Sequence, residues 1–129
     1  MIRTVDFRYD VHNDLVIATP YWHMETPEDC RIGFGQCDDY LRRFPGKIDV
    51  IFVFDHFTMS GNVMTLWGEY RARMIENYIR ISYRVNPKML VSIASMTNNA
   101  KRQTPNREAK SVEEAIAAIK AERIKMGVK

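Results

Sequence analysis

The chain has 129 residues, of which 46% are hydrophobic and 27% are charged, and its formal net charge is +3. These values are ordinary for one soluble folded domain and exclude a disordered chain. Two cysteines are too few for a disulfide scaffold, and the net charge is too small to indicate nucleic acid as a partner. We therefore predict a single domain over residues 1–129.

Acidic and basic side chains are unevenly distributed along the chain. Residues 1–70 carry a net charge of −5, whereas residues 71–129 carry +8. Such an asymmetry is explained either by attraction between the two parts within one fold or by a basic binding face. We favour the first explanation.

Cys30 and Cys37, the two cysteines, stand seven residues apart. In a helix this spacing puts both on one face with Cα atoms about 10 Å apart, which is too far for a disulfide. We therefore predict buried free thiols in a reducing cytoplasm.

The first residues have no apolar signal region, and the longest apolar stretch, Val50–Phe54, is far shorter than the roughly 20 residues of a membrane helix. The prediction is a cytoplasmic protein without a membrane span.

The N-terminal part predicts a β-hairpin. Residues Thr4–Asp10 alternate apolar and polar side chains, which indicates a half-buried strand. The turn-forming residues His12–Asp14 follow. Leu15–Thr19 is then the second strand, and it can extend to Met24.

A capped helix is predicted next. Thr26 can cap it, Pro27 suits its first position, and two acids follow. Gly33 and Gly35 weaken this helix, each by about 1 kcal/mol relative to alanine. Pro45–Gly46 ends it. Its apolar face is formed by Cys30, Phe34, Cys37, Leu41 and Phe44.

The apolar run Ile48–Phe54 predicts a central strand that is buried on both faces. Asp55 ends this strand, and Ser60–Asn62 leads into a second helix. The apolar side chains of that helix recur at helical spacing and are Val63, Trp67, Tyr70, Met74 and Tyr78.

Arg80–Val85 alternates apolar and polar side chains again and predicts another strand. Residues 87–100 fit a helix opened by Pro87, which we favour over a strand at Met89–Ala94. The chain then continues into a short link or edge strand at Asn106–Lys110.

The last predicted element is a helix that begins at Ser111. Ser111 and Glu114 have the spacing of a capping box, in which each side chain satisfies a free amide of the helix start. The complete order is ββαβαβα(β)α. Strands that alternate with helices form parallel pairs with right-handed crossovers. The predicted fold class is therefore α/β, with a mixed sheet and helices mainly on one face.

Basic and aromatic side chains are interleaved between residues 71 and 88. Such a pattern can bind nucleic acid, but the tyrosines fall on the predicted inward faces of their elements. We therefore predict core tyrosines and no nucleic-acid partner. The expected solvated basic rim comprises Arg71, Arg73, Arg80, Arg84 and Lys88.

Three stretches together are similar to a known family. They are the hairpin Val5–Thr19 before a capped helix, the strand Ile48–Phe54 with the segment 55–61 before a helix, and the closing helix from Ser111. Their order resembles the STAS fold of sulfate-transporter and anti-sigma-factor-antagonist domains, especially its SpoIIAA-like branch. In STAS antagonists a kinase phosphorylates a serine or threonine that opens the helix after the central strand, and this controls partner binding. Ser60 stands in the matching place, where it is preceded by Met59 rather than by an acid or a second serine.

The segment 55–62 is the best candidate site. In open α/β sheets, ligands meet the carboxyl ends of strands, where the next helix presents free amides and its positive dipole end. A phosphoryl group on Ser60 would add about −1.5 to −2 charges there. In the alternative interpretation, Ser60 or Asn62 only caps the helix. The candidate binding or regulatory residues are Asp55, His56, Phe57, Thr58, Ser60, Gly61 and Asn62.

The resemblance and this segment together predict a non-enzymatic regulatory or protein-binding module of STAS-like type. Its contact surface would be residues 55–62 and the start of the second helix, switched by phosphorylation of Ser60. Because this surface lies in the acidic part of the chain, a basic partner is slightly favoured. One alternative is a protein that binds a small anionic or lipid-like ligand, and another is an enzyme that uses His56 with Ser60 or Asp55. We predict a protein partner, with a homodimer as an alternative, and no catalytic residue, metal or cofactor.

Overall fold

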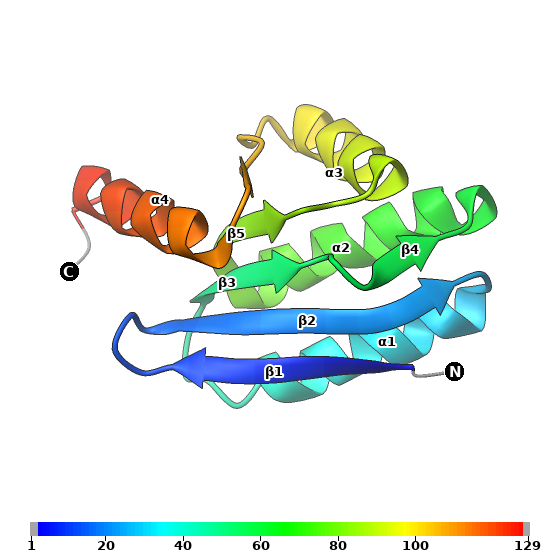
Figure 1. The fold of residues 1–129 in the computed structure, drawn as a ribbon, viewed down its shortest axis with the longest axis horizontal. Coiled ribbons are helices and arrows are strands. Elements are labelled where there is room, and N and C mark those ends of the chain that lie inside the picture. The colour runs from blue at the N-terminus through cyan, green and yellow to red at the C-terminus, as the bar shows by residue number, and fades with distance from the viewer. Residues whose placement is uncertain (1–2, 128–129) are drawn as a thin grey trace.

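A mixed β-sheet organises residues 3–127, the part of the chain that this computed structural model describes (Figure 1). Its strands are β1 (Thr4–Asp10), β2 (Leu15–Met24), β3 (Ile48–Val53), β4 (Phe57–Met59), β5 (Ile79–Val85) and β6 (Glu108–Ala109). The strand order is β1-β2-β3-β5-β6, and β4 pairs with β2. β1 and β2 are antiparallel, and the other pairs are parallel. The predicted α/β class with a mixed sheet is therefore confirmed.

Both faces of the sheet are covered by helices. The helices are α1 (Pro27–Leu41), α2 (Met64–Tyr78), α3 (Met89–Arg102) and α4 (Val112–Lys125). Helices α1 and α2 lie on one face, and α3 packs against α2 (Figure 1). Helix α4 lies on the opposite face. The sequence predicted helices mainly on one face, but it did not predict which helix would cover the other.

The central strand explains why two separate cores form. Val50 and Phe52 of β3 are buried in the core under α1 and α2. Ile51 points to the other side and is buried in the core under α4. Successive side chains of a strand alternate between faces, so an unbroken apolar strand needs a cover on both. The predicted double-sided burial of this strand is confirmed.

The predicted hairpin and the first helix are also confirmed. β1 pairs with β2 in a register that places Phe7 opposite Ala18, and β2 continues to Met24. Thr26 caps α1 by accepting a hydrogen bond from the amide of Asp29 (3.1 Å). The helix ends at Leu41, so Phe44 lies in the turn that follows and not on the helix.

The structure decides the ambiguous segment and adds one strand. Residues 89–102 form helix α3, as we favoured, and not a strand. The expected edge strand in Asn106–Lys110 is β6, with two residues. Strand β4 was not predicted and lies inside the candidate site. Because it has only three residues, it carries no recognisable alternation.

Both thiols are buried as predicted and neither forms a disulfide. Cys30 and Cys37 lie on the side of α1 that faces the sheet. Burial raises the pKa of Cys37 to about 12 and also raises the pKa of Cys30. A thiol that stays protonated is a poor nucleophile, so the structure assigns these cysteines to packing.

The two glycines of α1 differ in what surrounds them. A Cβ at Gly33 would collide with the end of the Met24 side chain, whereas a Cβ at Gly35 would meet nothing within 4 Å. We expect Gly35→Ala to raise the free energy of unfolding by up to about 1 kcal/mol, because alanine is the better helix former. For a domain of this size the melting temperature rises by about 3–5 °C. Gly33→Ala is the control, because its Cβ would collide with Met24. An equal or larger gain in stability there would show that this contact does not require glycine at position 33.

Candidate functional site

The segment 55–62 lies where β3 ends and passes through β4 into α2. Its predicted site residues do not share one environment. Asp55, His56, Thr58, Gly61 and Asn62 are exposed, and Ser60 is half-buried. Phe57, by contrast, is only 1% exposed.

Phe57 belongs to the core and not to the surface. Its ring lies 5.5 Å from the ring of Phe54 and 6.2 Å from that of Trp67, measured between centroids. Both neighbours are buried as well. The side chain therefore anchors the segment to α2 and is not available to a partner.

Ser60 and Thr58 meet a histidine that sequence reasoning did not include in the site. Nδ1 of His23 lies 2.6 Å from Oγ1 of Thr58, and Nε2 lies 3.4 Å from Oγ of Ser60. Glu25 Oε1 is also 3.4 Å from Nε2. The parallel pairing of β2 with β4 sets His23 opposite Thr58. No local pattern signals this pairing, because its partners are 35 residues apart.

Among the described residues, neither Ser60 nor Asn62 forms a capping hydrogen bond through its side chain, so the interpretation of these residues as helix caps is wrong. Ser60 precedes the short 3₁₀ turn Gly61–Val63, but its hydroxyl makes no capping hydrogen bond. The Asn62 amide group donates instead to the main-chain oxygen of Glu25 (3.1 Å). The main-chain amide of Ser60 donates to Met24 (2.9 Å), which ties the segment to β2. The Ser60 hydroxyl thus has only the His23 ring as its neighbour among the hydrogen bonds of residues 3–127.

Asp55 and His56 point to other neighbours. Asp55 Oδ1 accepts a hydrogen bond from the side chain of Asn86 (3.0 Å). The His56 ring stacks on Tyr21, with centroids 4.8 Å apart. Among the described residues no hydrogen bond joins His56 to Ser60 or Asp55. The geometry therefore gives no support to the alternative of an enzyme built on these three side chains.

An exposed apolar row on α3 adjoins this segment. Met89 is 75% exposed, Ile93 42% and Met96 49%. Their spacing puts them on one helical face. Lys88, just before α3, donates to the main-chain oxygen of Asp55 (3.2 Å), which holds the helix start beside the segment. We call Met89, Ile93 and Met96 the α3 row.

The expected solvated basic rim is wrong for two of its members. Arg71 is 7% exposed and Arg84 only 2%. Arg84 is paired with Glu108 (3.0 Å) from the neighbouring strand β6. Residues Arg73 and Lys88 are exposed as expected, and Arg80 is partly so. Helical and strand periodicity assigned the tyrosines to the inside, but it did not predict buried arginines.

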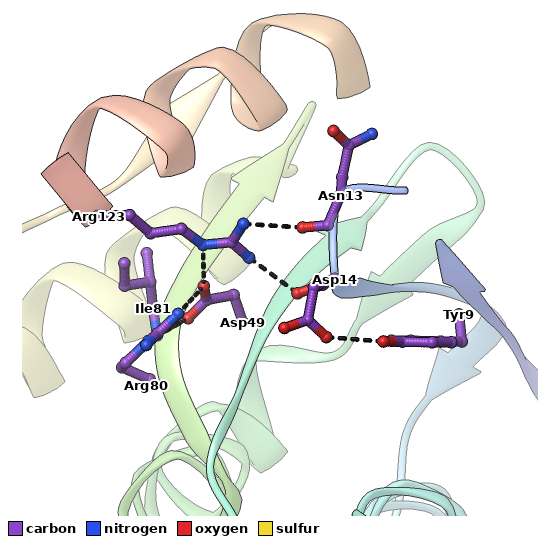
Figure 2. A network of polar contacts seen from close by, with 7 residues as sticks. All are labelled: Tyr9, Asn13, Asp14, Asp49, Arg80, Ile81 and Arg123. Atoms are coloured by element: carbon purple, nitrogen blue, oxygen red, sulfur yellow. Dashed lines mark hydrogen bonds and ion pairs between the residues drawn. The ribbon is translucent and has the colours of Figure 1, made fainter. Parts of the chain in front are cut away.

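A buried ion network lies at the opposite end of β3 (Figure 2). Asp49 is fully buried and accepts two hydrogen bonds from Arg80 (2.6 and 2.9 Å) and one from Arg123 of α4 (2.8 Å). Arg123 also donates to the main-chain oxygens of Asn13 and Asp14 (2.8 Å each), as Figure 2 shows. This network fastens α4 to β3 and to the hairpin turn. Both arginines share the single charge of Asp49, and Arg123 is further bonded to neutral main-chain oxygens, so we assign the network a structural role.

Residues 3–127 hold no group of three or more side chains placed to bind a metal ion. Nor does any helix of this part combine the length and the apolar character needed to cross a membrane. Comparison of the chain with family models, with curated proteins and with solved structures found no significant match.

Proposed function

We propose that this chain is a non-enzymatic regulatory module of STAS-like type that binds a protein partner through the segment 55–62 and the α3 row. The exposed α3 row beside this segment is the observation that carries the proposal. Exposed apolar patches of this kind mark interaction surfaces. The order of elements that resembles STAS domains supports the regulatory role, as an argument from fold likeness.

The charges around the α3 row select the partner's chemistry. Helix α3 contains no acidic residue, Lys88 precedes it, and Lys101 and Arg102 stand in its last turn. We therefore propose a partner segment with an apolar face flanked by acidic side chains, which would complement this basic border. This replaces the basic partner that the acidic N-terminal half of the sequence favoured, because Lys88 lies beside the segment and α3 contains no acidic residue.

Ser60 is the proposed switch. A phosphoryl group on its Oγ would add about −1.5 to −2 charges next to the His23 ring. Glu25 already contacts the same ring nitrogen. Phosphate and Glu25 would then compete for His23, and like charges would push Glu25 away. The proposed effect of phosphorylation is to rearrange this edge of the contact surface.

A photo-crosslinking amino acid at position 93 tests the proposal. We expect it to capture one partner, through a peptide that carries apolar and acidic side chains. The control is position 124, because Ile124 of α4 is 78% exposed but lies elsewhere. The captured peptide is then synthesised and its binding to the protein is measured. Ile93→Asp should weaken this binding by about tenfold or more, and Ile124→Asp should not. Ser60→Glu should change the affinity for the peptide, whereas Ala117→Glu, at an exposed position of α4, should not.

Three results would contradict the proposal. Equal capture of the same proteins at positions 93 and 124 would show that the α3 row is not a specific surface. A captured peptide rich in basic residues would refute the assigned partner chemistry. Capture of a second copy of this chain would replace the protein partner by a homodimer.

A further inference from the structure

A cavity lined by arginines lies between α2, α3 and β5, and no residue of the segment 55–62 contributes to it. Its volume is about 80 Å³, compared with the roughly 10–15 Å³ that one water molecule needs. No aspartate or glutamate is part of its wall. We call it the arginine pocket, and its basic side chains are Arg71, Arg80, Arg84, Arg102 and Arg107.

Four of the five arginines have a carboxylate partner outside the pocket wall. Their pairs are Arg80–Asp49 (2.6 Å), Arg84–Glu108 (3.0 Å), Arg102–Glu76 (3.4 Å) and Arg107–Glu122 (2.7 Å). These carboxylates fix the positions of the four arginines but do not line the pocket, so the pocket wall carries no negative charge.

Arg71 is the exception. It is 7% exposed, and no carboxylate of residues 3–127 lies within 4.0 Å of it. Its hydrogen bonds within this part all come from Nη1, which donates to Oδ1 of Asn99 (3.1 Å) and of Asn98 (3.5 Å). Burying an unpaired charge is costly. Burial, with repulsion from Arg84 and Arg102, lowers the pKa of Arg71 to about 10.

We propose that the arginine pocket binds an oxyanion of the phosphate class, with Arg71 as the principal ligand. Nε and Nη2 of Arg71 have no hydrogen-bond partner among the described residues. These two groups of a guanidinium form the planar fork that binds phosphate oxygens in pairs. An anion here would compensate the one arginine of the pocket that lacks an acid.

A neighbouring cavity indicates two sources for this phosphate group. Arg71, Ser82 and Arg84 also line an apolar cavity of about 40 Å³, whose wall includes Phe34 and Trp67. A free phosphate ion would occupy the arginine pocket alone. A phosphomonoester could place its phosphoryl group there and its apolar group toward the second cavity.

The competing explanation is that Arg71 only fastens α3 to α2 through Asn99. Asn99 is 4% exposed and also bonds to Asn106 (2.8 Å), so it is part of the structure that closes α3. That role uses Nη1 alone and needs no anion. The two explanations therefore differ in a measurable way, namely whether the wild-type protein binds phosphate at this position.

Calorimetric and NMR titrations of the full chain with inorganic phosphate test the proposal, with chloride at equal ionic strength as the reference. We expect saturable binding that shifts the side-chain amide signals of Asn98 and Asn99. Arg71→Met should weaken binding by about 10- to 100-fold, and Arg71→Lys should restore it only in part. Arg73→Met, an exposed arginine on the same helix, should bind like the wild type.

Phenyl phosphate forms the second arm. Binding that is at least about tenfold tighter than that of phosphate would assign the site to a phosphomonoester, and equal or weaker binding would assign it to the free ion. No saturation below about 10 mM of either compound would overturn the proposal. So would shifts confined to other residues of the wild type, a result that stands even if Arg71→Met fails to fold.

Discussion

Asp49→Asn is expected to lower the free energy of unfolding by about 3–5 kcal/mol, because it removes the fully buried anion that two partly buried arginine side chains share. Arg80 and Arg123 both converge on this carboxylate, and the amide of Ile81 donates to it as well (3.1 Å). Asparagine keeps the shape of the side chain but loses the charge and one acceptor. Urea unfolding at neutral pH measures the effect.

The matched control is Asp39→Asn. Asp39 also contacts an arginine, Arg42 (3.1 Å), but its side chain is 77% exposed. Exposed ion pairs contribute little, so we expect a loss of at most about 1 kcal/mol. A loss at Asp49 no larger than that at Asp39 would show that the buried network does not hold the fold together.

The same network makes stability depend on pH. Burial by itself would raise the pKa of Asp49, but the hydrogen bonds from Arg80 and Arg123 outweigh it, and the net pKa is lowered. The unfolded state therefore binds this proton more readily than the folded state. The contribution of Asp49 is complete above the ordinary aspartate pKa of about 3.9 and is lost as the pH falls through the lower folded value. The unfolding free energy of Asp49→Asn should lack this acid-induced loss.

Phe57→Ala is expected to have the second large effect, a loss of about 3–5 kcal/mol in the free energy of unfolding. The reason is the cavity that it would leave between Phe54 and Trp67. Phe57→Leu keeps most of the volume and should lose less. Thermal and urea unfolding of both variants measure the difference.

His56→Ala is the control for Phe57, because it changes the preceding, exposed residue of the same segment. We expect a loss of at most about 0.5 kcal/mol in the free energy of unfolding, in addition to what the stacking of the His56 ring on Tyr21 contributes. If Phe57→Ala unfolded at the same urea concentration as His56→Ala, Phe57 would have to be reassigned from the core to the surface.

The sequence predicted which segment forms the candidate site, but it did not predict which side chains surround that segment. The sequence located the segment 55–62 between a buried strand and a helix, and the structure has it there. It did not predict that His23, and not His56, would lie beside Ser60. This neighbour follows from the parallel pairing of β2 with β4, which depends on the path of the whole chain between them.

The sequence by itself determined the elements that local interactions specify. Alternation marked β1 and β5, the cap at Thr26 marked the start of α1, and the unbroken apolar run marked β3. These signals act between residues a few positions apart, so they can be recognised in a single sequence.

Only the tertiary structure decided which distant side chains meet. It placed α4 on the opposite face of the sheet, where Arg123 reaches Asp49, and it gathered arginines from α2, β5, α3 and the following loop around one pocket. A solvated basic rim and the arginine pocket, in which Arg71 and Arg84 are buried, have the same local pattern. They differ in how helices and strands far apart in the sequence pack together, because the burial of a charge is set by all the elements around it.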